Sequence, residues 1–312
     1  MILLTGVTGF VGNFLYQQLN YLNIPVNVTI RTEDSAIFFK KSIVVADINE
    51  KTDWSHALVG IDTVIHLAAR VHVMNESSRY PLSEFRLSNV ASTRNLAKQA
   101  ASAGVKRFIF LSSIKVNGES TEQECKYTEE DKPHPEDSYA LSKMEAEIAL
   151  FEIAQETGME VVIIRSPLVY GPGVKANFRS LMTMVSKGIP LPLAAVTDNR
   201  RSLVGVDNLV DFIITCIHHP AATNQVFLVS DDEDLSTAEL LHRMYKANGT
   251  ADRLFTLPLW FLNLCATTIK RKSVYSRLCG SLQIDISKSK QILGWIPPVS
   301  VDEGLRRAFG RY

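Results

Sequence analysis

The chain opens on a glycine-rich turn between a short apolar run and a helical pattern. Residues 1–4 are Met-Ile-Leu-Leu, glycines follow at Gly6, Gly9 and Gly12, and apolar residues recur at helical spacing over 14–22. Glycine lets the backbone turn tightly and approach a pyrophosphate, and the following helix N-terminus supplies free N–H groups. In this strand–turn–helix context, the glycine spacing predicts the first βα unit of a dinucleotide-binding fold.

The rest of the first half alternates between strand and helix patterns. Strands are expected at 26–30, 43–46, 64–69, 108–111 and 161–164, a loop at 71–83, and helices at 84–103 and 139–157. This order predicts an α/β fold with a doubly wound parallel (Rossmann) sheet. We expect residues 1–172 to form this domain, with later segments around 203–230 interleaved. Residues 173–312 are expected to form mainly a smaller α/β substrate-binding portion.

The end of the expected strand 26–30 bears on the choice of dinucleotide. An acidic residue at this point binds the ribose 2′-hydroxyl, whereas an arginine accommodates a 2′-phosphate. Arg31 stands at the strand end, and Glu33 and Asp34 come only later. We therefore expect a preference for NADP(H), with NAD(H) as the alternative.

Other strand ends carry residues suited to a cofactor, because ligands of such sheets bind outside the carboxyl ends of the strands. Asp47 could accept a hydrogen bond from the adenine amino group, and Ile48 could cover the ring. Ala68 and Ala69 are small and leave room. His66 lies within an apolar run and is expected to be a structural histidine.

Tyr139 and Lys143 are four residues apart in a helical pattern, so both lie on one face of the helix. An ammonium beside a phenol favours the phenolate, so Lys143 is expected to lower the tyrosine pKa from about 10. Such a pair suits proton transfer in an alcohol/ketone couple. The spacing is common by chance, and it gains meaning from the glycine turn and from Ser112 and Ser113 at a strand end.

The composition of the chain limits the kinds of partner and the cellular location that we expect. Lys plus Arg and Asp plus Glu each number 33, so a chain-wide basic footprint for nucleic acid is excluded. The four cysteines lack metal-ligand or disulfide spacing; no metal and a reducing, cytoplasmic location are expected. No secretory signal is expected at the N-terminus. Residues 254–269 are apolar but short and interrupted; a buried or interface helix is expected, without stable membrane insertion, and a peripheral membrane contact stays open.

These motifs together resemble the extended short-chain dehydrogenases/reductases, and among them the nucleotide-sugar epimerase/dehydratase group typified by UDP-glucose 4-epimerase. The resemblance covers essentially the whole chain. It rests on the glycine turn, on Asp47-Ile48, Leu67-Ala68-Ala69, Ser112-Ser113, Tyr139-x-x-x-Lys143 and Arg165-x-Pro167-x-x-Tyr170-Gly171-Pro172, and on C-terminal runs at 201–204 and 285–295.

The resemblance implies roles for individual positions. Ser113 would bind the reacting oxygen, Tyr139 would be the acid/base, and Lys143 would hold the nicotinamide ribose. A UDP-sugar substrate would be contacted by Ser113, Asn177, Arg201 and Arg277. Members commonly form homodimers through the two helices at 84–103 and 139–157. The implied cofactor contacts are Gly6, Thr8, Gly9, Phe10, Val11, Gly12, Arg31, Asp47, Ile48, Leu67, Ala68, Ala69, Asn89, Ser112, Tyr139, Lys143, Pro167 and Val169.

The resemblance leaves the reaction open. Asn117 stands where epimerases usually have tyrosine, and Ile114 and Lys115 stand where a dehydratase usually has an acid. Several runs are similar to a bacterial polysaccharide-pathway subgroup. Arg31 favours NADPH-dependent reduction at C4 of a UDP-4-keto-6-deoxy-N-acetylhexosamine, in O-antigen or capsule sugar synthesis. The alternative is a UDP-N-acetylhexosamine or UDP-glucose 4-epimerase with tightly bound NAD; a third is a non-catalytic nucleotide-binding regulator. The exact sugar stays open.

Overall fold

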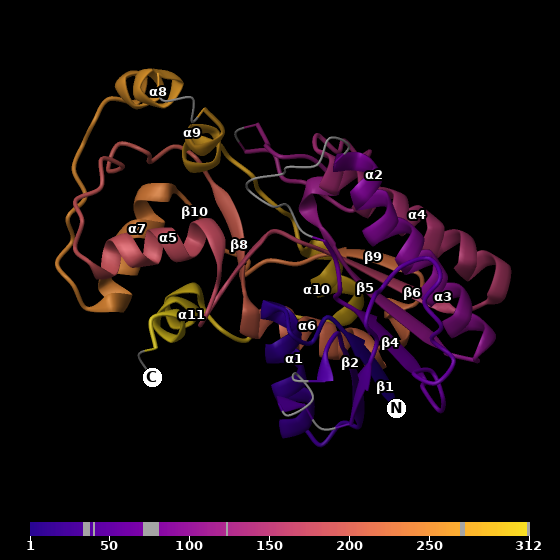
Figure 1. The fold of residues 1–312 in the computed structure, drawn as a ribbon. Helices are drawn as coiled ribbons and strands as arrows, with labels where there is room; N and C mark the ends of the chain where they lie inside the picture. Colours follow the sequence, from indigo (N-terminus) through magenta and orange to yellow (C-terminus); the bar gives the residue numbers. More distant parts are fainter. Residues whose placement is uncertain (34–37, 40, 71–80, 123, 269–271, 311–312) are drawn as a thin grey trace.

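A seven-stranded parallel sheet forms the centre of the larger part of the molecule. The computed structural model describes residues 1–33, 38–39, 41–70, 81–122, 124–268 and 272–310. The strands lie in the order β3-β2-β1-β4-β5-β6-β9, with every neighbouring pair parallel (Figure 1). Their bounds are β1 (Ile2–Thr5), β2 (Val26–Ile30), β3 (Ser42–Val44), β4 (Thr63–His66), β5 (Arg107–Ser113), β6 (Glu160–Ser166) and β9 (Gln225–Leu228). The doubly wound sheet predicted from the sequence is confirmed.

Helices cover both faces of this sheet. α1 (Phe10–Tyr21) and α6 (Val206–His218) lie on one face, and α3 (Ser92–Ser102) and α4 (Ser138–Thr157) on the other (Figure 1). Because side chains alternate along a strand, neighbouring residues enter opposite layers: Ile65 belongs to the core under α1 and α6, and Val64 to the core under α3 and α4. The near-continuous apolar strands are those expected of a sheet buried on both faces.

The helix expected over 84–103 is not one regular α-helix. α2 (Pro81–Phe85) leads into a π-helix, η2 (Arg86–Ala91), and only then into α3. The expected loop at 71–83 lies mostly outside the described residues, and its last three positions belong to α2. The wider π turn brings the buried Asn89 into contact with residues of two other segments, which are described with the site.

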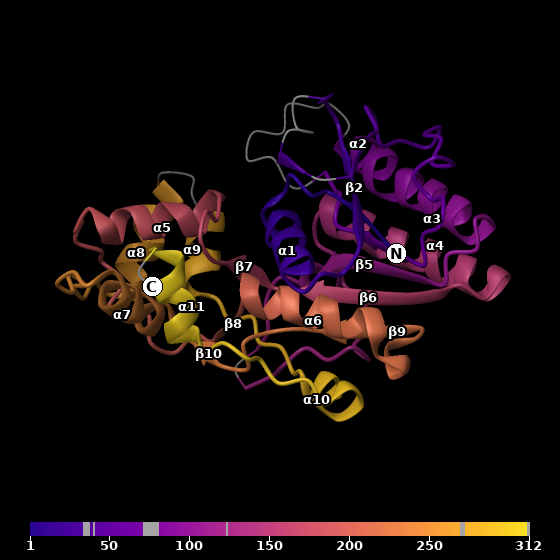
Figure 2. The ribbon, with the colours of Figure 1, turned by 90° about the horizontal axis from the view of Figure 1, so that it is seen from below.

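A smaller α/β part is built beside the large sheet. Its three strands lie in the order β10-β8-β7. Figure 2 shows its helices gathered at one end of the molecule. The elements are β7 (Leu168–Tyr170), β8 (Arg201–Gly205), β10 (Asp234–Leu235), α5 (Ala176–Ser186), α7 (Thr237–Asn248), α8 (Leu259–Thr268), α9 (Lys272–Cys279) and α11 (Val301–Ala308). Between these pieces the chain returns to the large sheet as α6 and β9, and later as α10 (Ser287–Leu293), which contacts β9.

Several element ends differ from the sequence expectation. The strands expected over 43–46 and 64–69 end at Val44 and His66, because the following residues leave the sheet to line a cavity. Val206 begins α6, and the short strands β7 and β10 were not expected. The chain also forms the 3₁₀ turns η3 (Ile114–Val116) and η4 (Pro220–Ala222). Among the described helices, none is both long and apolar enough to cross a membrane.

Candidate active site

The glycine turn forms a cradle that only glycine can occupy. Gly6 has φ +77°, and a Cβ there would lie 2.6 Å from the backbone nitrogen of Ala68. A Cβ on Gly12 would overlap the Gly6 carbonyl. Gly9 caps α1 without a side chain, so the first N–H groups of α1 stay available to an anion. The cradle and the helix end fit the diphosphate of a dinucleotide.

One cavity joins the cradle to the ends of three neighbouring strands. It is lined by Gly6, Thr8, Gly9, Thr29, Ile30, Arg31, Val45, Ile48, Leu67, Ala68 and Ala69. The structure thus brings together eight of the predicted cofactor residues, drawn from four separate stretches of sequence. Within the described residues, the buried Thr29 Oγ1 has no hydrogen-bond partner, so a ligand could supply one. The exposed side chain of Asp47 is not among the lining residues.

Tyr139 and Lys143 lie one turn apart at the start of α4. Asp137 caps this helix: its carboxylate accepts a hydrogen bond of 2.7 Å from the Ala140 N–H. Lys143 is 2% exposed, and its Nζ lies 3.9 Å from the centre of the Phe110 ring. Phe85 of α2 packs edge-on against Tyr139, with the ring centres 6.1 Å apart. Aromatic side chains from β5 and α2 therefore enclose the pair.

Burial dominates the electrostatics of this pair. It lowers the pKa of Lys143 to about 7, against the attraction of Glu147. Burial, followed by the negative charge of Asp137, raises the pKa of Tyr139 to about 12. The expected lowering of the tyrosine pKa is therefore wrong for this structure, because the phenolate is poorly solvated and Lys143 is only partly charged near neutral pH.

The two serines at the end of β5 point to different layers. Ser113 is half-buried, and its Oγ accepts a hydrogen bond of 3.3 Å from the Lys115 N–H, at the carboxyl edge of the sheet. Ser112 is buried, and its hydroxyl donates to the carboxylate of Glu147. The Ser112 side chain, predicted to bind the cofactor, is thus engaged in the interior, because adjacent residues of a strand face opposite ways.

A buried ion pair that was not predicted from the sequence joins α4 to β6 beneath the site. Arg165 Nη2 lies 2.6 Å from Glu147 Oε2, and its Nε donates to the same carboxylate. Arg165 Nη1 donates to Asn117 Oδ1 at 2.9 Å, and Asn117 Nδ2 donates to the Thr128 carbonyl at 2.8 Å. The signal in the sequence was the spacing of Glu147, one turn after Lys143. Asn117, noted as a departure from the epimerase pattern, holds the long loop to β6.

Asn89 is a second buried residue that connects segments around the site. Its Oδ1 accepts from the Arg70 N–H at 2.8 Å, and its Nδ2 donates to the Arg70 carbonyl and, at 3.0 Å, to Ser142 Oγ. These bonds engage both ends of the Asn89 amide and give the residue a structural role, while its contact with a cofactor stays a prediction. They tie the π-helix to α4, on the turn between Tyr139 and Lys143.

His66 is a structural residue, as expected. Its ring nitrogens are bonded to Thr5 Oγ1 at 2.7 Å and Thr93 Oγ1 at 3.0 Å. Burial, and then the charge of Lys143, lower its pKa to about 3, so it is neutral at physiological pH. Of the remaining predicted cofactor residues, Phe10, Val11 and Val169 pack against the core below the cradle, and Pro167 is buried between β6 and β7.

Two predicted substrate residues come together in the smaller part. Arg201 begins β8 and Arg277 lies on α9. Burial, and then the positive charge of Arg277, lower the pKa of Arg201. Arg201 Nη1 also donates to the Gly280 carbonyl at 3.1 Å. Two guanidinium groups that repel each other form a site an anion would stabilise. Asn177 is exposed in the first turn of α5.

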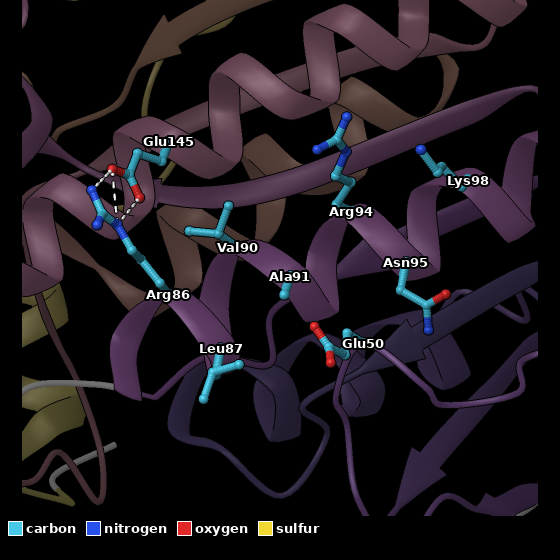
Figure 3. A pocket seen from close by; sticks show the side chains of 9 residues that line it. All are labelled: Glu50, Arg86, Leu87, Val90, Ala91, Arg94, Asn95, Lys98 and Glu145. Atoms are coloured by element: carbon cyan, nitrogen blue, oxygen red, sulfur yellow. Dashed lines mark hydrogen bonds and ion pairs between the residues drawn. The ribbon is translucent and has the colours of Figure 1, made fainter. Parts of the chain in front are cut away.

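A separate cavity lies on the outer face of η2, α3 and α4. Figure 3 shows the Arg86 side chain directed at Glu145, with Arg86 Nε 2.9 Å from Glu145 Oε2. Its lining consists of Glu50, Arg86, Leu87, Val90, Ala91, Arg94, Asn95, Lys98 and Glu145. Leu87 is exposed here, and Ile148 is exposed further along α4. In the described part of the chain, no three His, Cys, Asp or Glu side chains are grouped to hold a metal ion.

Comparison with known proteins decides the family. The pattern of the NAD dependent epimerase/dehydratase family matches residues 2–230. The chain belongs to this family. This epimerase/dehydratase is 49% identical to the UDP-glucose 4-epimerase of Vibrio cholerae over 311 residues, covering 98% of this chain and 93% of the relative. The resemblance stated from the motifs, to extended short-chain dehydrogenase/reductase enzymes, is confirmed.

Two further matches are to sugar epimerases. It is 28% identical to the N-acetyl-alpha-D-glucosaminyl-diphospho-ditrans,octacis-undecaprenol 4-epimerase of Escherichia coli O157:H7, covering 98% of this chain and 93% of that protein. The structure of UDP-glucuronic acid 4-epimerase from Bacillus cereus with NAD aligns with a TM-score of 0.77 at 21% identity, covering 99% and 96% of the two chains. The structural match supports the fold.

Proposed function

We propose that the protein is a UDP-sugar 4-epimerase that acts with a tightly held NAD. The observation that carries the proposal is the 49% identity with a UDP-glucose 4-epimerase over nearly the whole chain. The placement of Ser113, Tyr139 and Lys143 at the carboxyl edge of the sheet supports it. In this proposal residues 1–172, with the later segments, hold the dinucleotide, and the remainder holds the sugar nucleotide.

The chain's own residues bind the sugar and move one proton. A bound nicotinamide supplies reversible hydride exchange at C4 of the sugar. Tyr139 transfers a proton to and from the C4 oxygen, and the Ser113 hydroxyl hydrogen-bonds the same oxygen. Lys143 has a pKa of about 7, so its ammonium form can donate a hydrogen bond toward the Tyr139 hydroxyl, and its amine form can accept a proton. Asp137, Glu147 and Arg165 hold the first turns of α4 in place.

The diphosphate of the substrate is assigned to the arginine pair. Arg201 and Arg277 present two guanidinium groups, and Asn177 lies at the start of α5. The relative from Escherichia coli is named for a sugar carried on a polyprenol diphosphate, which shares the diphosphate but not the uridine. UDP-glucose, UDP-N-acetylglucosamine and the polyprenol-linked sugar should therefore be offered side by side; turnover of the polyprenol-linked sugar alone would overturn the UDP part of the proposal.

The discriminating experiment supplies a UDP-sugar without added dinucleotide. An epimerase interconverts the two C4 configurations with no net oxidation or reduction, because the hydride returns to the sugar. The product ratio is measured by NMR, and the bound dinucleotide by mass spectrometry after denaturation. C4 interconversion with bound NAD is expected.

The NADPH-dependent 4-keto reductase remains a second candidate, favoured by one observation. Arg31 lines the cavity at the end of β2, where an arginine suits a 2′-phosphate. Stoichiometric NADPH oxidation on a 4-keto sugar nucleotide, without interconversion of UDP-sugars, would replace the epimerase proposal with this one.

The proposal includes a homodimer formed through helices 84–103 and 139–157. The exposed Leu87 and Ile148 support it, because apolar side chains on two adjacent helices suit a helical interface. Light scattering should give twice the chain mass of 34.8 kDa. The double variant Leu87→Glu/Ile148→Glu should give the single mass; a parent protein that is already monomeric would contradict the dimer.

A further inference from the structure

Helix α8 is an apolar helix without a buried residue. It lies at the outer end of the smaller part and contacts α9 (Figure 1). Trp260 is 69% exposed and Leu264 55% exposed, and Leu259 and Phe261 are exposed as well. Its sequence contains no charged residue. A helix that is apolar all round is normally covered, by a protein core or by lipid.

The smaller part covers only a little of this helix. Leu262 packs against the core cluster formed by α5, α7 and α11, and it is the α8 residue that does so among the described residues. The aromatic side chains of Trp260 and Phe261 stack edge-on at 5.7 Å between ring centres, and Phe255 just before the helix is also exposed. Contiguous exposed apolar surface of this kind marks an interaction site.

The charge around α8 indicates the chemistry of its partner. From Arg253 to Gly280 the sequence has no Asp or Glu and five basic residues, although the whole chain is neutral. Two of them, Lys272 and Arg277, are exposed on α9, the helix that contacts α8. Apolar and aromatic side chains flanked by basic ones match the surface of a bilayer with anionic lipids, where the rings insert and the cations meet the headgroups.

The length of α8 fits a helix that lies on a membrane rather than across it. Ten residues of α-helix extend about 15 Å, whereas the hydrocarbon core is about 30 Å thick. Tryptophan is enriched at the boundary between hydrocarbon and headgroups, which is where an exposed Trp260 would lie.

We propose that α8 anchors the protein to the surface of anionic phospholipid bilayers, with Trp260 and Leu264 inserted and Lys272 against the headgroups. The proposal does not depend on the reaction assigned above. It places α9, and with it Arg277, close to the membrane surface.

The full chain can be tested with vesicles. Vesicles of phosphatidylcholine alone and of phosphatidylcholine with phosphatidylglycerol are incubated with the protein and sedimented. Co-sedimentation is expected with the anionic vesicles and should weaken with added salt, because surface charge attraction is screened. Trp260 also reports directly, since Trp54 and Trp295 are buried. Its emission should shift to the blue on binding.

Matched variants distinguish insertion of α8 from nonspecific binding to vesicles. Trp260→Ser and Leu264→Ser together should weaken partitioning by about tenfold or more, since each removes buried apolar area. Ile296→Ser, at a side chain 70% exposed outside α8, should change nothing. Parent protein that stays in the supernatant with both vesicle types would overturn the proposal. A second outcome would also overturn it: the parent protein does not bind vesicles, its mass rises with protein concentration, and Trp260→Ser abolishes that rise. The α8 helix would then be covered by a second copy of the chain.

Discussion

Lys143 is a lysine enclosed between β5 and α4, with an aromatic ring under its ammonium group. Its low pKa and the high pKa of Tyr139 leave both side chains able to exist uncharged near neutral pH. In the proposed reaction, a proton taken from the sugar hydroxyl by Tyr139 would be matched by transfer of the Tyr139 proton to the uncharged Lys143 amine, which would then carry the positive charge over the Phe110 ring. The burial of Tyr139 and Lys143 therefore determines the protonation states available to both side chains.

Replacing Tyr139 by phenylalanine tests the acid/base assignment. Loss of the hydroxyl should lower kcat between about a hundredfold and ten-thousandfold, with a much smaller change in KM, because general acid–base catalysis acts in the transition state. Steady-state turnover of the UDP-sugar measures this. Tyr21→Phe, at an exposed position of α1, is the control. Full activity in Tyr139→Phe would remove Tyr139 from the mechanism.

The pKa of Lys143 also predicts how stability depends on pH. The folded-state pKa of about 7 is below the unfolded value, so the unfolded chain binds more protons between these two values. The destabilisation by Lys143 is complete below pH 7 and is relieved as pH rises toward about 10. Lys143→Met should therefore be more stable than the parent at neutral pH, by an amount that shrinks toward pH 10.

Urea unfolding between pH 7 and pH 10 measures this difference. This window lies between the pH ranges in which two other groups affect stability, His66, whose pKa falls from 6.5 to about 3 on folding, and Tyr139, whose pKa rises from 10 to about 12. Parallel pH profiles of the parent and Lys143→Met would show that Lys143 is charged in the folded state throughout.

At the scale of elements, the Glu147–Arg165 pair joins α4 to β6 beneath the site. Both side chains are buried, and Ser112 and Asn117 complete their hydrogen bonds. Removing one partner of such a pair leaves an uncompensated buried charge, whereas replacing both with apolar residues can be close to neutral. The pair therefore fixes the position of α4 more than it adds stability.

The variant Glu147→Gln should lower the free energy of unfolding by about 3–5 kcal/mol, because Arg165 keeps its charge. The double variant Glu147→Leu/Arg165→Met should recover much of the loss, and denaturant unfolding of both measures it. Glu152→Gln, on the same helix but in an exposed pair 4.0 Å from Arg94, should cost at most about 1 kcal/mol. Equal losses at Glu147 and Glu152 would contradict the argument.

Elements were predictable where their pattern is local. The apolar runs predicted the strands. The spacing of the glycines and of Tyr139 and Lys143 predicted the parts of the site that lie close together in the sequence. The π turn η2 was not predictable, because Asn89 is held by Arg70 and Ser142, which are distant in sequence. The same holds for β7 and β10, which are two or three residues long and exist through pairing with β8. The Tyr139 pKa was mispredicted because burial cannot be read from i, i+4 spacing.

At the scale of the whole molecule, the cofactor cradle and the arginine pair belong to different parts. In the proposed function, a sugar nucleotide held by Arg201 and Arg277 would extend toward Tyr139 on the large sheet. A ligand that binds only the folded chain raises its free energy of unfolding by about 2.7 kcal/mol when the ligand concentration is a hundred times Kd. We therefore expect ligands of the smaller part to stabilise the protein.

This expectation gives a prediction for Arg277→Gln. UDP should raise the Tm of the parent clearly, and of the variant much less, because one guanidinium is lost. Without UDP the variant should be at least as stable as the parent, since Arg201, whose pKa is lowered by burial and then by the charge of Arg277, loses a repelling neighbour. Thermal melts with and without UDP measure both effects. An equal UDP-dependent shift in the two proteins would exclude Arg277 from the nucleotide site.

The position of β9 has a consequence for biosynthesis. β6 is buried on both faces and is completed as an inner strand only by β9, after the chain has passed through β7, α5, β8 and α6. While the ribosome is still making those segments, the emerging chain presents an apolar strand with an unpaired edge, which is a template for association with other chains. The nascent chain is therefore most open to association with other chains between the synthesis of Ser166 and that of Gln225.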